Sequence, residues 1–235
     1  IGEASTLYLS SRIAIEEILN YQPEARFIAM LRHPADMAHS WHQQNVYSNF
    51  DDLRAFRDAW DAQSRRRQGR DVPRSCPEPR LLQYSDMCML GEQMRRLTDS
   101  VEPDRVHWIF LEDLSRDTEQ EYARVLRFLD LPCQQKTDFR TLNAAKMHRS
   151  STLQTIVTWG SRMKRRMGIH RSLGVYQLNV KRAPRPPLPS DLRELLTRHF
   201  SSDIQLLSKV TQRPLDTWLP PRSIGKEATT HQTAS

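Results

Sequence analysis

Two short apolar runs stand out from a chain in which most apolar residues have helical spacing. They are RFIAML at 26–31 and RVHWIFL at 105–111, and each follows a turn that contains a proline. Both runs have the length and the β-branched or aromatic content of strands in a parallel sheet. The tripeptide IGE at 1–3 reads as the end of a further strand. The pattern therefore predicts parallel strands that each end in polar or charged residues.

Elsewhere the apolar residues recur at the three- and four-residue spacing of amphipathic helices. Tyr122, Val125, Leu126 and Leu129 repeat at i, i+3, i+4 and i+7. Similar segments follow the serines at 10 and 11, follow the aspartates at 51 and 52, and begin near position 190. Strands that alternate with helices predict an α/β fold, a parallel sheet flanked by helices. In such folds ligands bind beyond the carboxyl ends of the strands.

The chain has 235 residues, enough for one domain, which we place at 1–220. Residues 221–235 lack any apolar pattern and are predicted to form a disordered tail. No apolar run approaches the roughly 20 residues that cross a bilayer, so no membrane span is predicted. The three cysteines have no metal-ligand spacing, and an odd number cannot pair completely within the chain. We predict no metal and a reducing, cytoplasmic location.

The charge pattern favours an anionic partner. The formal net charge is +7, and arginines concentrate in SRRRQGR (64–70) and RMKRRMGIHR (162–171). Such an excess attracts nucleic acid, nucleotides or acidic glycans alike, and solvated helix faces are the plainer explanation of each patch. A nucleic-acid-binding module would also need an aromatic platform, zinc spacing or a helix-turn-helix pattern, and the sequence has none of these. We therefore predict no nucleic-acid partner.

The stretch FIAMLRHPADMAHSWHQQN (27–45) combines a strand, an arginine and the start of a helix. Pro34 suits the first position of a helix, where the amide hydrogen that it lacks would have no partner. The remaining first-turn amides and the helix dipole attract an anion. Arg32 adds a guanidinium, and Ser40 adds a hydroxyl about two turns later. The pattern predicts a phosphate site, and an ordinary strand-to-helix turn with a surface arginine is the alternative.

These residues resemble the 3′-phosphate-binding segment of sulfotransferases that use 3′-phosphoadenosine 5′-phosphosulfate (PAPS). The resemblance is greatest to the heparan-sulfate type, in which R-x-P-x-[ED]-R-x-x-S followed by aromatic residues is typical. The residues that match this pattern are Arg32, Pro34, Asp36, Ser40 and Trp41. Met37 stands where the family usually has a second arginine.

Two further segments resemble the same family, in the family's order. IGEASTLYL (1–9) is similar to the segment G-E-K-[ST]-x-x-Y-[LF], with Ala4 where many members have lysine. LNAAKMHRSSTL (142–153) resembles the late loop that bacterial members place over the nucleotide, with Lys146 and Arg149 among its polar positions. The family's lysine-containing loop for the 5′-phosphosulfate normally precedes the first of these segments. No such glycine-rich loop occurs in residues 1–235, so the resemblance implies an N-terminally truncated domain.

The resemblance implies a P-loop-NTPase-like sulfotransferase fold and an enzyme that uses PAPS as co-substrate. The sulfuryl group would pass to a hydroxyl or amine acceptor such as a carbohydrate. Arg32 and Ser40 would hold the 3′-phosphate, and Lys146 and Arg149 would close over the nucleotide. Glu3 is the predicted catalytic base, with a helix-capping or ion-paired carboxylate as its alternative. A nucleotide kinase-like protein, a basic nucleic-acid-binding module and a fragment that is inactive alone remain as other interpretations.

Overall fold

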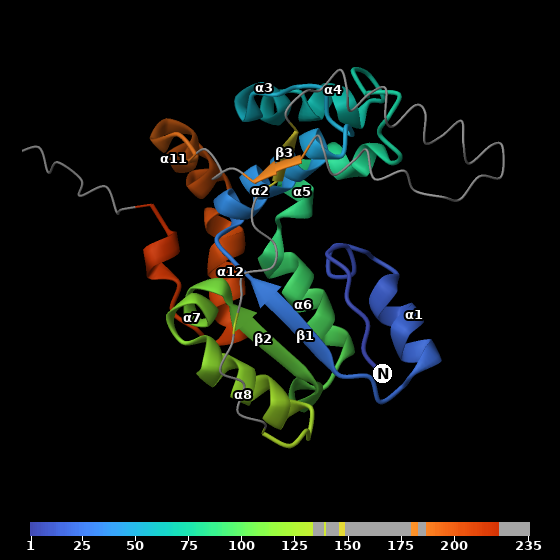
Figure 1. Ribbon diagram of the computed structural model, residues 1–235, viewed down its shortest axis with the longest axis vertical. Helices are drawn as coiled ribbons and strands as arrows, with labels where there is room; N and C mark the ends of the chain where they lie inside the picture. Colours follow the sequence, from blue (N-terminus) through green and yellow to red (C-terminus); the bar gives the residue numbers. More distant parts are fainter. Residues whose placement is uncertain (134–138, 140–145, 149–179, 183–186, 221–235) are drawn as a thin grey trace, which may run out of the picture.

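The computed structural model describes residues 1–133, 139, 146–148, 180–182 and 187–220. Its centre is a parallel pair of strands, β1 (Phe27–Leu31) and β2 (Val106–Phe110), which lie side by side in Figure 1. In the register of this pair, Phe27 lies opposite Val106 and Leu31 lies opposite Phe110. Both strands coincide with the apolar runs of the sequence, so the prediction of two parallel strands is confirmed.

Helices make up most of the remaining described chain. They are α1 (Ala14–Tyr21), α2 (Pro34–Tyr47), α3 (Phe56–Asp61), α4 (Gln63–Arg67), α5 (Tyr84–Met87), α6 (Leu90–Ser100), α7 (Leu111–Arg116), α8 (Thr118–Phe128), α11 (Ser190–His199) and α12 (Ser201–Thr211), with 3-10 turns η1 (Pro79–Leu82), η2 (Pro103–Arg105) and η3 (Asp216–Trp218). A separate antiparallel pair joins β3 (Lys146–His148) and β4 (Val180–Arg182). Within the described ranges, no helix is both long enough and apolar enough to span a bilayer. The predicted tail at 221–235 lies outside the described residues.

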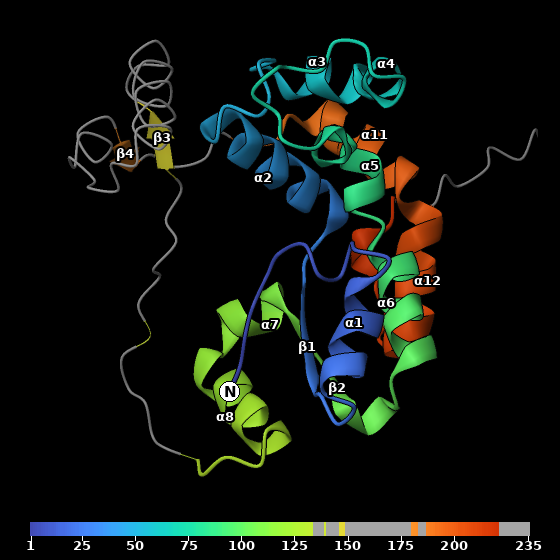
Figure 2. The ribbon, with the colours of Figure 1, turned by 90° about the vertical axis from the view of Figure 1, so that its right-hand side faces the viewer.

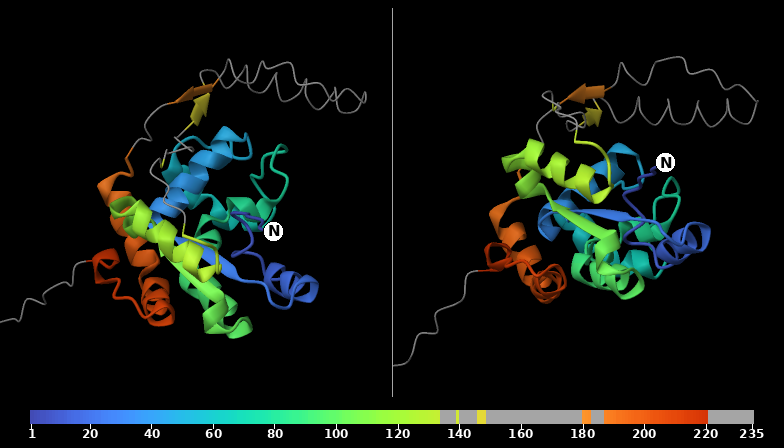
Figure 3. Two further views of the ribbon diagram at one scale, coloured as in Figure 1. Left: turned by 60° about the horizontal axis from the view of Figure 1, so that its bottom comes forward. Right: turned by 90° about the horizontal axis from the view of Figure 1, so that it is seen from below.

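Helices cover the strand pair on two sides. In Figures 2 and 3, α7 and α8 lie on one side of the strands, whereas α1, α6 and α12 lie on the other. The cover is incomplete on β1, where Ala29 and Leu31 are buried but Ile28 and Met30 are 40% and 61% exposed. Helices therefore flank the pair as predicted, but they leave part of β1 open. The contacts of α7 and α8 are with β2, the strand that they follow in the chain.

The first residues do not form the strand that IGE predicted. Residues 1–5 have no regular structure, and a turn follows at 6–10. Hydrogen bonds within the segment replace a strand ladder, because the Tyr8 hydroxyl donates to Glu3 and the Leu7 amide donates to the Ser5 hydroxyl at 3.2 Å. The Ser11 hydroxyl then accepts from the Ala14 amide at 3.2 Å. The helix predicted after the serines is thus present as α1.

The last helix pair holds α6 in place. Asp203 of α12 is buried, and its carboxylate accepts hydrogen bonds from the Gly91 amide at 2.8 Å and the Glu92 amide at 2.9 Å. These amides belong to the first turn of α6, where a carboxylate also complements the helix dipole. A Cβ atom on Gly91 would lie 2.3 Å from the Asp203 carbonyl oxygen. Only glycine therefore permits this approach of the two helices.

A buried ion pair fixes the segment that follows α2. Arg66 donates to both carboxylate oxygens of Asp51, at 2.7 and 2.8 Å, and both side chains are fully buried. The Tyr84 hydroxyl donates to the same carboxylate, and the Leu53 amide donates to it at 2.9 Å. Four donors therefore compensate the burial of one carboxylate. Burial and the Asp51 charge raise the pKa of Tyr84, so this hydroxyl stays protonated.

We predict that Arg66→Met destabilises the fold by about 3–5 kcal/mol, because it leaves the Asp51 carboxylate buried without its cation. Urea unfolding at neutral pH measures the change. The matched control is Arg65→Met, since Arg65 pairs with Asp71 at the surface and an exposed pair contributes less than about 1 kcal/mol. An equal decrease in the free energy of unfolding in both variants would contradict the prediction that the buried pair matters more than the exposed one.

Candidate functional site

The parallel pairing brings two charged strand ends to one edge of the sheet. Arg32 and His33 follow β1 directly, and α2 begins one residue later at Pro34. Glu112 and Asp113 lie in the first turn of α7, which follows β2 without a gap. Residues far apart in the sequence therefore surround the start of α2, as the rule for parallel sheets predicts.

His33 caps α2 with its imidazole ring. The Nδ1 atom accepts a hydrogen bond from the Ala35 amide, and Nε2 lies 3.2 Å from the carbonyl oxygen of Trp218. An accepting Nδ1 requires the proton on Nε2, which then donates to that carbonyl. The ring also lies against the Trp218 indole, with centroids 5.4 Å apart. The C-terminal segment therefore packs over His33.

This cap changes the predicted anion site. The Ala35 amide is bonded to the His33 ring. The expectation that the first-turn amides stay open for an anion is therefore wrong for this amide. The Met37 amide, which donates to the His33 carbonyl at 3.0 Å, makes the first regular bond of the helix.

Arg32 and Ser40 occupy positions that suit the predicted role. Arg32 is half-buried at the end of β1, and its Nε atom is shielded from solvent. Its charge acts on the Cys88 thiol, whose pKa is nevertheless raised because the thiol is fully buried. Ser40 is half-buried on α2, about 9 Å along the helix from Pro34. No described contact joins the two side chains directly.

An ion pair offsets the one carboxylate in the first turn of α2. Asp36 accepts two hydrogen bonds from Arg193 of α11. Without Arg193 the Asp36 carboxylate would repel a phosphate near Arg32. The pair therefore gives the Asp36 carboxylate a cation of its own.

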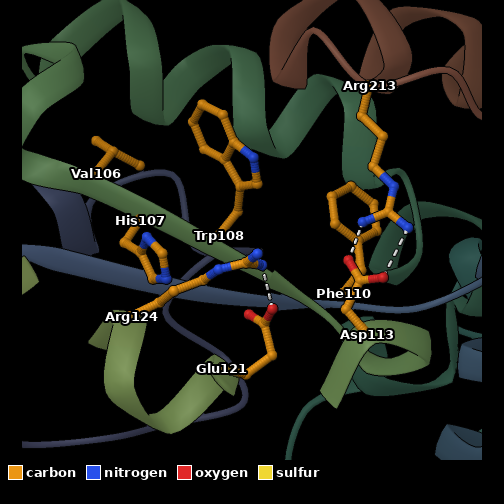
Figure 4. Close-up of a pocket in the computed structure, with 8 residues that line it drawn as sticks. All are labelled: Val106, His107, Trp108, Phe110, Asp113, Glu121, Arg124 and Arg213. Atoms are coloured by element: carbon orange, nitrogen blue, oxygen red, sulfur yellow. Dashed lines mark hydrogen bonds and ion pairs between the residues drawn. The ribbon is translucent and has the colours of Figure 1, made fainter. Parts of the chain in front are cut away.

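A pocket of about 320 Å³ lies along the outer edge of β2. Figure 4 shows two ion pairs in its wall, Arg124 with Glu121 and Arg213 with Asp113. The Arg213 guanidinium also lies 4.1 Å from the centroid of the Phe110 ring. These contacts hold the pKa of Asp113 below its ordinary value, chiefly through the bond to Arg213. Neither Arg32 nor Ser40 lines this pocket, so it is not the predicted phosphate site.

The remaining predicted site residues are placed only in part. Lys146 begins β3, which contacts α2 and lies near the end of that helix farthest from β1 in Figure 2. Arg149 lies outside the described residues. Glu3 is exposed, and its carboxylate accepts from the Tyr8 hydroxyl, which raises the pKa of Tyr8. No described contact joins Glu3 to Arg32 or Ser40, so the role of Glu3 as a base stays a prediction.

The sequence analysis missed the residues that close the site from the C-terminal side. They are Arg193, Arg213 and Trp218, which contact the start of α2 or the start of α7. No feature of the neighbouring sequence indicates these roles, because each residue contacts a partner at least 100 residues away in the chain. His33 could have been recognised, since a polar residue directly before a proline at the first helical position is a capping position.

Parallel strands that lie side by side, with helices on both sides of the pair, define an α/β protein. The family is specified by comparison with known proteins, because the sulfotransferase domain family matches residues 15–200. The chain therefore belongs to the sulfotransferase domain family.

A solved structure supports the fold. The chain is similar to the crystal structure of a sulfotransferase from Alicyclobacillus acidocaldarius, with a TM-score of 0.63 and 23% sequence identity. The similarity covers 92% of this chain and 66% of that chain. The P-loop-like sulfotransferase fold predicted from the sequence is thereby confirmed. A search of curated proteins gave no match.

We predict that the stability of the chain falls as the pH is lowered below about 6.5. Burial lowers the pKa of His33 and of His42 in the folded chain. The unfolded chain, with ordinary values near 6.5, then takes up protons that the folded chain resists, so acid favours unfolding. Urea unfolding at pH 7.5, 6.5 and 5.5 measures this dependence.

The variant His33→Asn isolates the contribution of His33 to the pH dependence of stability, because asparagine also caps helices but does not titrate. Its stability should depend less on pH than that of the parent chain, and the shared effect of other titrating groups cancels in the comparison. An identical pH dependence in both proteins would show that His33 protonates equally in the folded and unfolded states.

Proposed function

We propose that this chain is a PAPS-dependent sulfotransferase domain that transfers a sulfuryl group to a hydroxyl or amine acceptor such as a carbohydrate. The observation that carries the proposal is the family match over residues 15–200, together with Arg32, Pro34 and Ser40 at the carboxyl end of β1. Membership of the sulfotransferase domain family indicates that the reaction is sulfuryl transfer. The position of these residues favours a phosphate-bearing nucleotide as the donor.

The 3′-phosphate of the donor would lie beside the start of α2. Arg32 would bind it through two guanidinium hydrogen bonds, and Ser40 would donate its hydroxyl from farther along the helix. His33 would act indirectly, since its cap fixes where the helix begins. The Asp36–Arg193 pair would keep a bare carboxylate away from the phosphate. Side chains with these roles fit a doubly charged terminal phosphate.

The late segment would complete the nucleotide site. Lys146 begins β3, and this strand contacts α2, the helix that carries Ser40. Two cations at Lys146 and Arg149 would add attraction for the nucleotide's phosphates. This arrangement would bind the nucleotide from two segments more than 100 residues apart in the chain.

Sulfuryl transfer resembles phosphoryl transfer, because the group moves in line between two oxygens while negative charge grows on the leaving oxygen. PAPS supplies the activated sulfuryl group. The residues assigned here hold the far end of the nucleotide, and correct positioning is a large part of such catalysis. Glu3 would take the proton from the acceptor, an effect that typically accelerates a reaction about 10²–10⁴-fold.

A nucleotide kinase-like protein is the principal alternative, because it would also bind a phosphorylated nucleotide at the carboxyl ends of parallel strands. The two classes differ in ligand preference. A sulfotransferase should bind adenosine 3′,5′-bisphosphate in preference to ATP, whereas a kinase should show the reverse. A nucleic-acid-binding module should bind neither adenosine 3′,5′-bisphosphate nor ATP more tightly than it binds a nucleic acid of the same charge.

We predict that Arg32→Ala weakens the binding of adenosine 3′,5′-bisphosphate by about 1.5–3 kcal/mol, the scale of a charged hydrogen bond. Isothermal titration calorimetry measures the affinity, with adenosine 5′-monophosphate as the ligand that lacks the 3′-phosphate. Ser40→Ala should act in the same direction but less strongly, because a neutral donor contributes less.

The control for Arg32→Ala is Arg57→Ala, which removes an exposed arginine whose partner is Asp191. Its affinity for the nucleotide should equal that of the parent chain. The assignment of Arg32 and Ser40 fails if the parent chain binds the nucleotide equally well with and without its 3′-phosphate.

We also predict that Lys146→Ala and Arg149→Ala each reduce nucleotide affinity, by about 1 kcal/mol or more, because each removes a cation from the phosphates. Bound adenosine 3′,5′-bisphosphate should protect residues 144–150 from hydrogen exchange measured by mass spectrometry. Unchanged exchange in this segment, with the nucleotide bound elsewhere, would remove both residues from the site.

A further inference from the structure

Three arginines surround the turn that precedes α1. Arg96, on α6, donates from Nη2 to the carbonyl oxygen of Leu9 at 3.0 Å. Arg80, in η1, donates to the next carbonyl, that of Ser10. Arg12 lies two residues beyond Ser10 and is exposed. We call these three residues the arginine cluster; its members come from three separate elements.

The arginine cluster differs from most other described arginines in its partners. Eleven further arginines of the described chain form side-chain ion pairs with carboxylates at 3.5 Å or less. Among them is Arg95, which is adjacent to Arg96 and pairs with Glu92 and Asp99. Within the described part of the chain, no carboxylate forms an ion pair with any member of the cluster. The cluster is therefore a local concentration of positive charge.

The charges of the other two members act on Arg96. Its pKa is lowered first by burial and then by the charges of Arg12 and Arg80, while the nearby Glu92 charge acts in the opposite direction. Like charges held together in this way are unfavourable until an anion neutralises them. Each guanidinium has five N–H donors in a planar fork, and the two carbonyl bonds use only one nitrogen of Arg80 and one of Arg96. Donors for the oxygens of an anion therefore remain.

The groups of the turn that bind the cluster carry no full charge. Arg80 and Arg96 donate to backbone carbonyls, which orient the two side chains. The turn's hydroxyl groups are bonded within the chain, since Ser10 donates to the Leu7 carbonyl at 3.0 Å and Ser11 accepts from the start of α1. This combination of fixed orientation and uncompensated charge suits a small anion with several oxygens.

We propose that the arginine cluster binds a tetrahedral oxyanion, a sulfate or phosphate group, at a site separate from the nucleotide site of Arg32 and Ser40. This inference goes beyond the proposed function, because none of its residues takes part in holding the donor. The oxyanion is either a free inorganic ion or a group carried by a larger molecule such as a sulfated oligosaccharide. Three guanidinium groups provide the same recognition in both cases.

The test compares two salts in three proteins. Sodium sulfate and sodium chloride of equal ionic strength are titrated in thermal-shift and calorimetric experiments against the parent chain, the double variant R12Q/R80Q and the control Arg95→Gln. Arg12 and Arg80 are chosen because both are exposed, so their replacement should leave the fold intact. Arg95 carries the same charge on the same helix as Arg96, but it already has carboxylate partners.

We expect sulfate to bind the parent chain and Arg95→Gln equally, and to bind the double variant at least tenfold more weakly. The general stabilising effect of sulfate through exclusion from protein surfaces is shared by all three proteins and cancels in the comparison. Equal responses to sulfate and chloride in the parent chain would overturn the proposal. Equal loss of sulfate binding in Arg95→Gln would also overturn it, since net charge alone would then explain the effect.

Two further ligands identify the source of the oxyanion and separate this inference from the proposed function. A sulfated disaccharide that binds more tightly than inorganic sulfate, with the same dependence on Arg12 and Arg80, supports a group carried by a glycan. Adenosine 3′,5′-bisphosphate should bind the double variant as well as it binds the parent chain. A weaker affinity for this nucleotide would place the cluster in the nucleotide site and overturn its separate role, whereas loss through Arg32→Ala alone concerns only the proposed function.

Discussion

The parallel pairing of β1 with β2 determines which side chains meet at the candidate site. Because Leu31 lies opposite Phe110, the residues after both strands leave the sheet at the same edge. Arg32 and His33 therefore lie at the same edge of the sheet as the start of α7, although about 80 residues of chain separate the two segments. A shift of the register by one residue would turn each side chain of a strand to the opposite face and separate these groups.

Helix α2 is held at both ends, and this fixes the distance between Arg32 and Ser40. Its first turn is bound to the C-terminal part of the chain through His33 and Asp36. Toward its other end, the side chains of Trp41 and Asn45 both donate to the carbonyl oxygen of Leu81, at 2.8 and 2.9 Å. A helix anchored in this way can present a hydroxyl to a phosphate with little loss of conformational entropy on binding.

The arginines of this basic chain have three different environments. Arg66 is fully buried with Asp51 and stabilises the fold. Arg213 is partly buried, where it joins the C-terminal segment to β2 through Asp113 and the Phe110 ring. In the arginine cluster at the turn before α1, Arg80 and Arg96 donate to backbone carbonyls. The net charge of +7 therefore does not describe a uniform basic surface.

The sequence by itself determined the elements whose signal is local. The apolar runs predicted both strands, and Pro34 marked the residue at which α2 begins, directly after Arg32 and His33. Three residues of IGE could not show whether a neighbouring strand is available to pair with them, so that prediction failed. Only the tertiary structure decided the contacts that join distant segments, such as His33 with Trp218, which are 185 residues apart. The physical reason is that an amphipathic pattern records which face of an element is buried, but not which other element buries it.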